Sequence, residues 1–332
     1  MDIYNVLNPS QNRVCQLLGI ETPIIQGGLA YVGNGSLAAA VSEGGGFGQV
    51  GSAGRTLENF EREIIIARSK TKNPFGVNIP ISAHTDFTPF FEILKRHRSD
   101  IRAVSFGGGN PAPYIKTIKD MGFITMVVIS SPNQASKAER LGADIIICEG
   151  YEAGGHNGKA ELTTFTLIPQ VRRAVSVPVV AAGGISDEKG LIASIILGAD
   201  GVQMGTRFVA TTECEAHNHY KELIVNSGED STTVLIRDIK GPLRVYKNDY
   251  AVMVRNLEKN NADTEEILPF IKGVKNKNAA IDGDFENGYA ALGQVSSLID
   301  GIISATDVVL EIANKSKKIL RPFHVGYGSL QN

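Results

Sequence analysis

The chain of 332 residues is 42% hydrophobic and 20% charged, which suits one large domain or one large and one small domain. A net charge of −2 gives no basic excess for binding nucleic acid or an anionic membrane surface. No apolar run is long enough to span a bilayer, and residues 1–13 are too polar for a signal peptide. The three cysteines are far apart, so we expect a cytoplasmic protein without disulfides.

The first two thirds of the chain alternates short, almost continuously apolar runs with amphipathic stretches. The expected strands are Pro23–Gln26, Phe47–Val50, Phe75–Ile79, Ala103–Phe106, Ile124–Ile129, Asp144–Cys148, Pro178–Ala182 and Gly201–Met204. The expected helices are Ser36–Glu43, Leu57–Ser69, Pro89–Arg96, Ala112–Met121, Asn133–Leu141, Thr166–Ala174, Asp187–Leu197 and Glu213–Asn226. Eight regular strand–helix units favour a (β/α)8 TIM barrel over the alternative, an open doubly wound sheet.

The pattern changes after about residue 225. Residues 227–297 are polar, lack apolar strand runs and place apolar residues at helical spacing. We therefore expect a smaller, mostly helical domain or lid inserted at 227–297 into a barrel formed by residues 1–226. A stripe of apolar residues predicts a helix over about 298–320 that returns to the barrel.

Two glycine-containing segments follow the last two expected strands, where such barrels often bind phosphate. The first contains Gly183 and Gly184, and the second contains Gln203, Met204, Gly205 and Thr206. Glycines let backbone N–H groups approach an anion, and a following helix adds a favourable dipole. The plainer alternative is a pair of tight turns, but two such loops side by side favour a phosphate site.

Earlier strand ends offer room for a flat ring. Gly27, Gly28 and Leu29 follow the first strand, and Asn78 ends the third with both a donor and an acceptor. A planar group and a phosphate in one barrel suggest flavin mononucleotide (FMN). No G-x-G-x-x-G sequence opens a dinucleotide-binding unit.

His156 is the histidine best placed for proton transfer, because it follows Gly154 and Gly155 in a strand-end loop. Glu149 and Glu152 could orient it or hold a cofactor. The plainer alternative is a histidine that caps a turn. A metal site made of these side chains is disfavoured because no second histidine lies at ligand spacing, so no metal is expected.

Other candidates are weaker. His84 lies further along its loop without flanking glycines, and His217 with His219 would face different sides of a helix. Cys148 ends an apolar run and resembles a buried small hydrophobe. Arg244 and Lys247 could reach a substrate anion or could lie in a solvated turn. These weaker candidates are not included in the expected site.

Several of these segments together resemble the nitronate monooxygenases and their relatives, the flavin-dependent enoyl-acyl-carrier-protein reductases. The matching segments are Pro23–Gly28, Phe75–Asn78, Gly108–Pro111, Glu149–His156, Ala181–Ile185 and Gln203–Phe208, with a looser match at Gly293–Gln294. The resemblance implies an FMN-bearing barrel with a helical lid, in which His156 faces the flavin as the catalytic group. It implies FMN contacts at Asn78, Glu149, Gly154, the Gly183–Gly184 pair and Gln203–Thr206.

The resemblance leaves two reactions open. The first is oxidation of alkyl nitronates to a carbonyl compound and nitrite. The second is reduction of enoyl thioesters on acyl carrier protein, with NADH or NADPH as co-substrate. Many nitronate monooxygenases have glutamine where this chain has Glu149, which leans toward the reductases, whereas the segment from Asn78 to His84 lacks their Met/Leu-rich stretch. Broad family usage makes nitronate oxidation the leading prediction. We expect a small-molecule substrate, and the chain could form a homodimer.

Overall fold

Eight parallel strands form a closed barrel in the computed structural model, which describes residues 7–81, 86–239, 241–260 and 262–328. The strands are β1 (Ile24–Gln26), β2 (Gly48–Gly51), β3 (Phe75–Pro80), β4 (Ile101–Gly107), β5 (Ile124–Ile129), β6 (Ile145–Glu149), β8 (Val179–Ala182) and β9 (Gly201–Met204). Neighbouring strands pair in parallel, and β1 pairs with β9. A bridge between Ile25 and Phe47 joins β1 to the start of β2 and completes the circle. The expected TIM barrel is confirmed.

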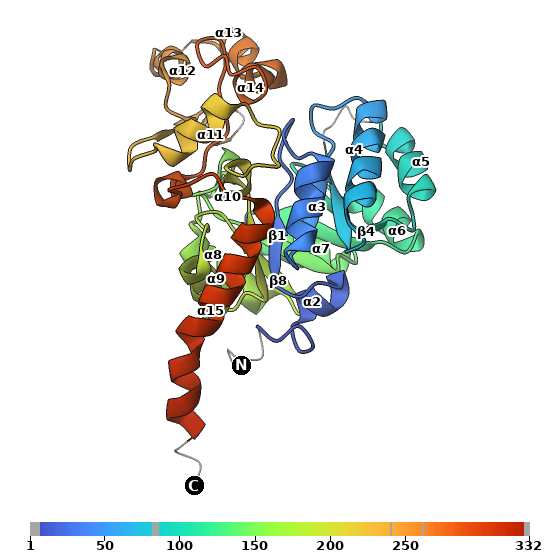
Figure 1. Ribbon diagram of the computed structural model, residues 1–332. Helices are drawn as coiled ribbons and strands as arrows, with labels where there is room; N and C mark the ends of the chain where they lie inside the picture. Colours follow the sequence, from blue (N-terminus) through green and yellow to red (C-terminus); the bar gives the residue numbers. More distant parts are fainter. Residues whose placement is uncertain (1–6, 82–85, 240, 261, 329–332) are drawn as a thin grey trace.

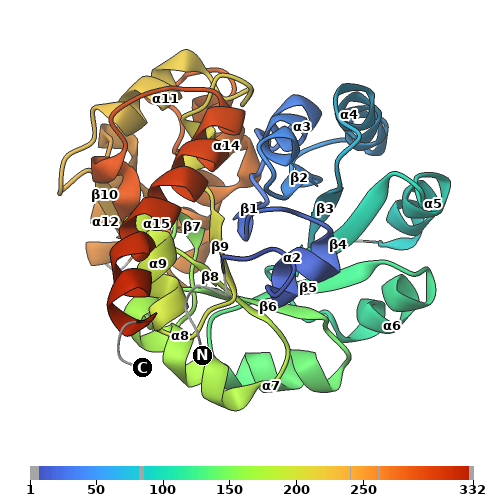
Figure 2. The same ribbon diagram turned by 60° about the horizontal axis from the view of Figure 1, so that its bottom comes forward.

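Helices surround the strands (Figure 2). They are α2 (Arg13–Leu18), α3 (Gly35–Glu43), α4 (Leu57–Lys70), α5 (Thr88–Arg96), α6 (Ala112–Asp120), α7 (Pro132–Arg140), α8 (Thr164–Ala174), α9 (Glu188–Ile196), α10 (Thr206–Val209) and α11 (Asn218–Val225). Side chains of Thr56, Ser131 and Asp187 accept the N-capping hydrogen bonds of α4, α7 and α9. The helix expected from Glu213 begins only at Asn218, because His217 caps it by accepting a bond from the His219 N–H.

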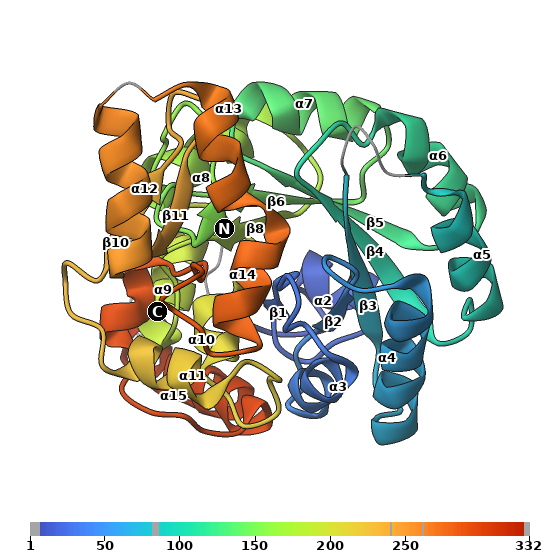
Figure 3. The same cartoon turned by 90° about the horizontal axis from the view of Figure 1, so that it is seen from above.

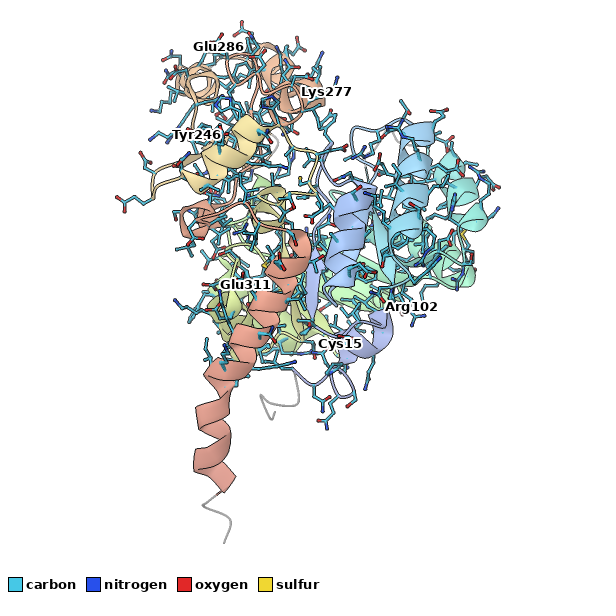
Figure 4. All side chains as sticks on the ribbon, viewed as in Figure 1. Cys15, Arg102, Tyr246, Lys277, Glu286 and Glu311 are labelled. Carbon is cyan, nitrogen blue, oxygen red and sulfur yellow. The ribbon has the colours of Figure 1, made fainter. Side chains whose placement is uncertain are left out.

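The barrel interior is closed at one end by α2. Val14, Cys15 and Leu18 of α2 pack against Phe47 and other inward-facing apolar side chains of the strands. Figure 4 shows Cys15 at the opposite end of the molecule from Lys277 and Glu286. Any ligand site must therefore lie at the other end, where the carboxyl ends of the strands open.

A second unit, which we call the cap (residues 227–297), lies over that open end (Figures 1 and 3). It contains β10 (Thr232–Leu235), β11 (Leu243–Tyr246), α12 (Asp249–Lys259), α13 (Thr264–Ile267), the 3₁₀ helix η1 (Leu268–Ile271) and α14 (Gly273–Ala280). The cap has a small apolar core of its own, which includes Leu235, Val245, Val254 and Ile267. The hairpin of β10 and β11 departs from the sequence analysis, which expected no strands here.

The hairpin was not expected because its strands are short and because their third partner is remote in sequence. That partner is β7 (Gly155–His156), which pairs antiparallel with β11. The three strands make a small sheet that joins the loop after β6 to the cap.

The C-terminal helix α15 (Ala305–Gly328) runs along the outside of the barrel and continues beyond it (Figure 1). It follows a 3₁₀ helix, η2 (Gln294–Leu298), so it starts later than the expected residue 298. Val308, Val309 and Ile312 are buried, and the helix contacts α3 and α9. Of the helices described, none combines the length and apolarity that crossing a membrane requires.

Gly48 allows α3 to pack directly on β2. A Cβ atom at Gly48 would lie 1.9 Å from the Ala38 carbonyl oxygen, whereas a Cβ at Gly228 would meet nothing within 4 Å. We predict that Gly48→Ala lowers the free energy of unfolding by about 2 kcal/mol, because the helix must shift outward. Urea unfolding measures this, with Gly228→Ala as the control. Equal effects of the two substitutions would contradict the packing argument.

Candidate active site

A cavity of about 310 Å³ opens at the carboxyl ends of the barrel strands. The structure brings every residue of the expected site to its walls. They are Gly27, Gly28, Leu29, Asn78, Glu149, Gly154, Gly155, His156, Gly183, Gly184, Gln203, Met204, Gly205 and Thr206. The clustering fits one ligand held by several strand-end loops, and the contacts of each residue with a ligand stay a prediction.

The loops after β8 and β9 present backbone N–H groups without partners. Among the residues described, nothing accepts a hydrogen bond from the backbone N–H of Gly184, Gly205 or Thr206. Gly183 and Gly184 have φ of 91° and 73°, a region that glycine adopts without strain. A Cβ at Gly183 would also lie 2.8 Å from the Gly150 carbonyl oxygen. Unpaired donors converging on one end of the cavity fit a phosphate-sized anion.

Gly28, Asn78 and Gln203 form another part of the cavity wall, which we call the bed because the sequence predicts a flat group there. A Cβ at Gly28 would lie 2.1 Å from the Asn78 Oδ1, so only glycine lets β3 approach the loop after β1 this closely. The Asn78 amide donates to Ser105 Oγ at 2.8 Å, which directs its carbonyl oxygen away from Ser105. Gln203 Oε1 accepts from Gln49 Nε2 at 3.4 Å, which leaves its own amide hydrogens for other partners. The bed therefore offers both an acceptor and a donor to a heterocycle edge.

Glu149 and Glu152 have different environments. Burial raises the pKa of Glu149 to about 7. Glu152 accepts hydrogen bonds from the backbone N–H of Thr164 at 2.9 Å and from its hydroxyl at 3.0 Å. Glu152 thus binds the N-terminus of α8, whereas the pKa of Glu149 lies near neutral pH.

His156 stands where two cavities meet. A second cavity of about 650 Å³ shares Gly108, Val128, Glu149 and His156 with the first. Its apolar wall comes from the end of β5 and from α7, and Lys137 and Lys159 lie at its edge. In the described part of the chain neither lysine forms an ion pair. A ligand in the second cavity can therefore touch the histidine and meet unpaired positive charge.

The weaker sequence candidates lie elsewhere. Lys247 pairs with Asp230 at the surface, and His219 lies at the exposed start of α11. Arg244 is only 4% exposed and lines neither cavity, so it does not lie in a solvated turn and does not reach a substrate there. His84 lies outside the described residues. The described part of the chain holds no cluster of three metal-ligating side chains.

The sequence analysis did not predict the part of the first cavity wall that α11, α14 and residues 291–293 form. Tyr220, Asn276, Ala280 and Ala291 line it together with Gly293. Only the looser motif match at Gly293 signalled this part of the wall. Tyr220, Asn276 and Ala280 lie on α11 and α14, and the local sequence pattern of a helix does not show which cavity the helix meets.

The sequence profile described as nitronate monooxygenase matches residues 11–315. The chain belongs to the nitronate monooxygenase family. A probable nitronate monooxygenase of Staphylococcus aureus is 30% identical, with 94% of this chain and 99% of that protein covered. The family resemblance drawn from the motifs is confirmed, and membership makes the chain a flavin-dependent oxidoreductase.

Two solved structures share the architecture along nearly the whole chain. FabK from Thermotoga maritima superposes with a TM-score of 0.88 at 38% identity, covering 95% of this chain and 99% of that one. A nitroalkane oxidase from Streptomyces ansochromogenes superposes with a TM-score of 0.81 at 26% identity, covering 94% and 99%. The barrel and the cap therefore recur together in both relatives.

We predict that the Glu149 carboxyl is half protonated near pH 7, whereas an exposed glutamate titrates at about 4.3. The shift follows from burial, which disfavours the charged form. Infrared difference spectra of the ligand-free protein would show a protonated-carboxyl band that fades as pH rises through 7 and is missing in Glu149→Gln. A spectrum in which no such band survives above pH 5.5 would contradict the prediction.

Proposed function

We propose that the chain is an FMN-dependent enzyme that oxidises alkyl nitronates or nitroalkanes to a carbonyl compound and nitrite. The proposal is supported by relatives whose names specify nitronate monooxygenase and nitroalkane oxidase activity. The observation that carries it is the position of His156, at the junction between the bed for a flat group and the second cavity. A substrate in the second cavity would meet the histidine beside the cofactor.

The residues of the first cavity suit FMN. The N–H groups of Gly184, Gly205 and Thr206 would bind the phosphate, and Asn78 and Gln203 would bind the edge of the ring. We assign as cofactor-binding residues Gly27, Gly28, Leu29, Asn78, Glu149, Gly154, Gly155, Gly183, Gly184, Gln203, Met204, Gly205 and Thr206. Bound FMN would supply an electron acceptor that returns its electrons to oxygen. The cap would serve as the lid of this site.

His156 would act on the substrate in one of two protonation states. The neutral imidazole can remove the acidic proton from the carbon beside a nitro group, and the imidazolium can attract the oxygens of a nitronate anion. Protonated Glu149 adds no negative charge beside an anionic substrate below about pH 7. A catalytic site built this way needs no metal.

The size of the second cavity favours a second candidate function, the NADH- or NADPH-dependent reduction of enoyl thioesters. Its volume of about 650 Å³ exceeds what a short nitroalkane requires. Its apolar wall suits an acyl chain, and Lys137 and Lys159 suit a phosphate on a pantetheine arm or a nicotinamide nucleotide. In this candidate, acyl carrier protein would present the substrate, and His156 would polarise the thioester carbonyl or supply a proton.

One anaerobic experiment separates the two functions. The FMN-loaded protein is mixed with NADH or NADPH, and then separately with an alkyl nitronate, while the visible flavin absorbance is recorded. Bleaching by the nitronate alone supports nitronate oxidation. Rapid bleaching by NADH or NADPH supports the reductase and overturns our first choice.

We predict that His156→Ala lowers kcat/KM for nitrite release by about 10²- to 10⁴-fold, because the substrate loses its proton-transfer group. FMN affinity should change little, since the predicted phosphate donors belong to other loops. Nitrite release from nitroethane, which still carries the acidic proton, measures the loss. His219→Ala, which alters an exposed histidine away from both cavities, is the control. Full turnover by His156→Ala would contradict a catalytic role.

A further inference from the structure

The short strand that carries His156, β7, is paired with strand β11 of the cap. Leu243 of β11 lies opposite His156, and Arg244 lies opposite Gly155. The next residue, Asn157, donates its backbone N–H to the Pro242 carbonyl at 2.8 Å. A pairing of only two residues is weak alone, so its register depends on what holds β11 against the loop.

The side chain of Arg244 keeps β11 against this loop. Its Nε donates to the Tyr151 carbonyl at 3.1 Å, and its Nη1 donates to Thr232 Oγ1 at 3.2 Å. Its guanidinium also lies over the Tyr151 ring, with Cζ at 4.7 Å from the centroid. One buried side chain thus links β10 to the start of the histidine loop.

Arg237 contacts the same ring from outside. Its Nη2 donates to the Tyr151 hydroxyl at 2.6 Å, and its Nε pairs with Glu161 at 2.8 Å. This arginine is 54% exposed, so its contacts compete with water and contribute little. The buried and exposed arginines on one tyrosine form a natural pair for comparison.

We propose that Arg244 is a positioning residue for His156: it fixes the register of β7 on β11 and thereby sets where the imidazole lies between the two cavities. Arg244 acts only through the loop, because it lines neither cavity. The inference rests on the proposed function, in which His156 acts on the substrate. A displacement of about 1 Å at such a group can lower a rate about 10²-fold.

The test compares Arg244→Ala with Arg237→Ala. We expect kcat for nitrite release to fall at least tenfold in Arg244→Ala and to stay within about twofold in Arg237→Ala, where FMN affinity should also stay unchanged. The decrease in kcat should be equal for propionate-3-nitronate, which carries a carboxylate, and for ethyl nitronate, which carries none. Added guanidinium ion should restore part of the rate, because it can occupy the vacated space. Arg244→Lys should stay impaired, since one ammonium cannot span both acceptors.

A structural readout makes the test independent of turnover. Hydrogen exchange on the FMN-free protein should be faster over residues 150–158 in Arg244→Ala than in the parent protein. Tyr151→Leu removes the stacked ring at a half-buried position, so it should also speed exchange over residues 150–158 and lower kcat. This second variant keeps the test valid if Arg244→Ala folds poorly.

Several results would overturn the inference. They are an unchanged kcat, a rise in KM alone for the carboxylated substrate, or unchanged exchange over residues 150–158 in a folded variant. The rise in KM would instead mark Arg244 as a substrate ligand. A parent protein that binds no FMN and releases no nitrite would refute the proposed function, while the exchange measurement would still decide whether Arg244 holds the loop.

Discussion

Closure of the barrel is the constraint on which the rest of the structure depends. All eight strands run in parallel, so their carboxyl ends meet at one rim, and α2 fills the other end with Val14, Cys15 and Leu18. Loops that are far apart in sequence are thereby brought into one ring. Burial raises the pKa of Cys15 to about 12, in keeping with a thiol that only packs. The cavity is a consequence of this geometry, and the cap can approach the barrel from one side only.

Much of the first cavity consists of backbone. The N–H groups of Gly184, Gly205 and Thr206, which have no partner among the described residues, belong to loops that line this cavity. Such a surface depends on small residues and on φ values above zero, and both leave a clear trace in sequence as glycine. The glycine-lined wall is therefore the part of the expected site that one sequence reveals best.

The same reasoning explains what the sequence could and could not predict. Strands such as Ile124–Ile129 are continuous apolar runs because both faces are covered, so their position was predicted from composition alone. The hairpin of Thr232–Leu235 and Leu243–Tyr246 has four residues in each strand, and β11 pairs with a strand more than eighty residues earlier. Local periodicity carries no information on such a pairing, so the sequence left Arg244 open as either a substrate ligand or a residue of a solvated turn.

The two cavities are lined by different kinds of residues, and His156 lines both. Many glycines line the first cavity beside polar side chains such as Asn78 and Gln203, whereas the second cavity takes apolar side chains from β5 and α7, such as Ile129 and Ala138. Relatives named for different reactions share the barrel and the cap. Under the proposed function, a chain of this family could keep the glycines of the first cavity while the side chains of the second cavity change. Because the strand that carries His156 is paired with the cap, a change in the hairpin would also move His156, so under the proposed function a change in the cap would alter the catalytic geometry.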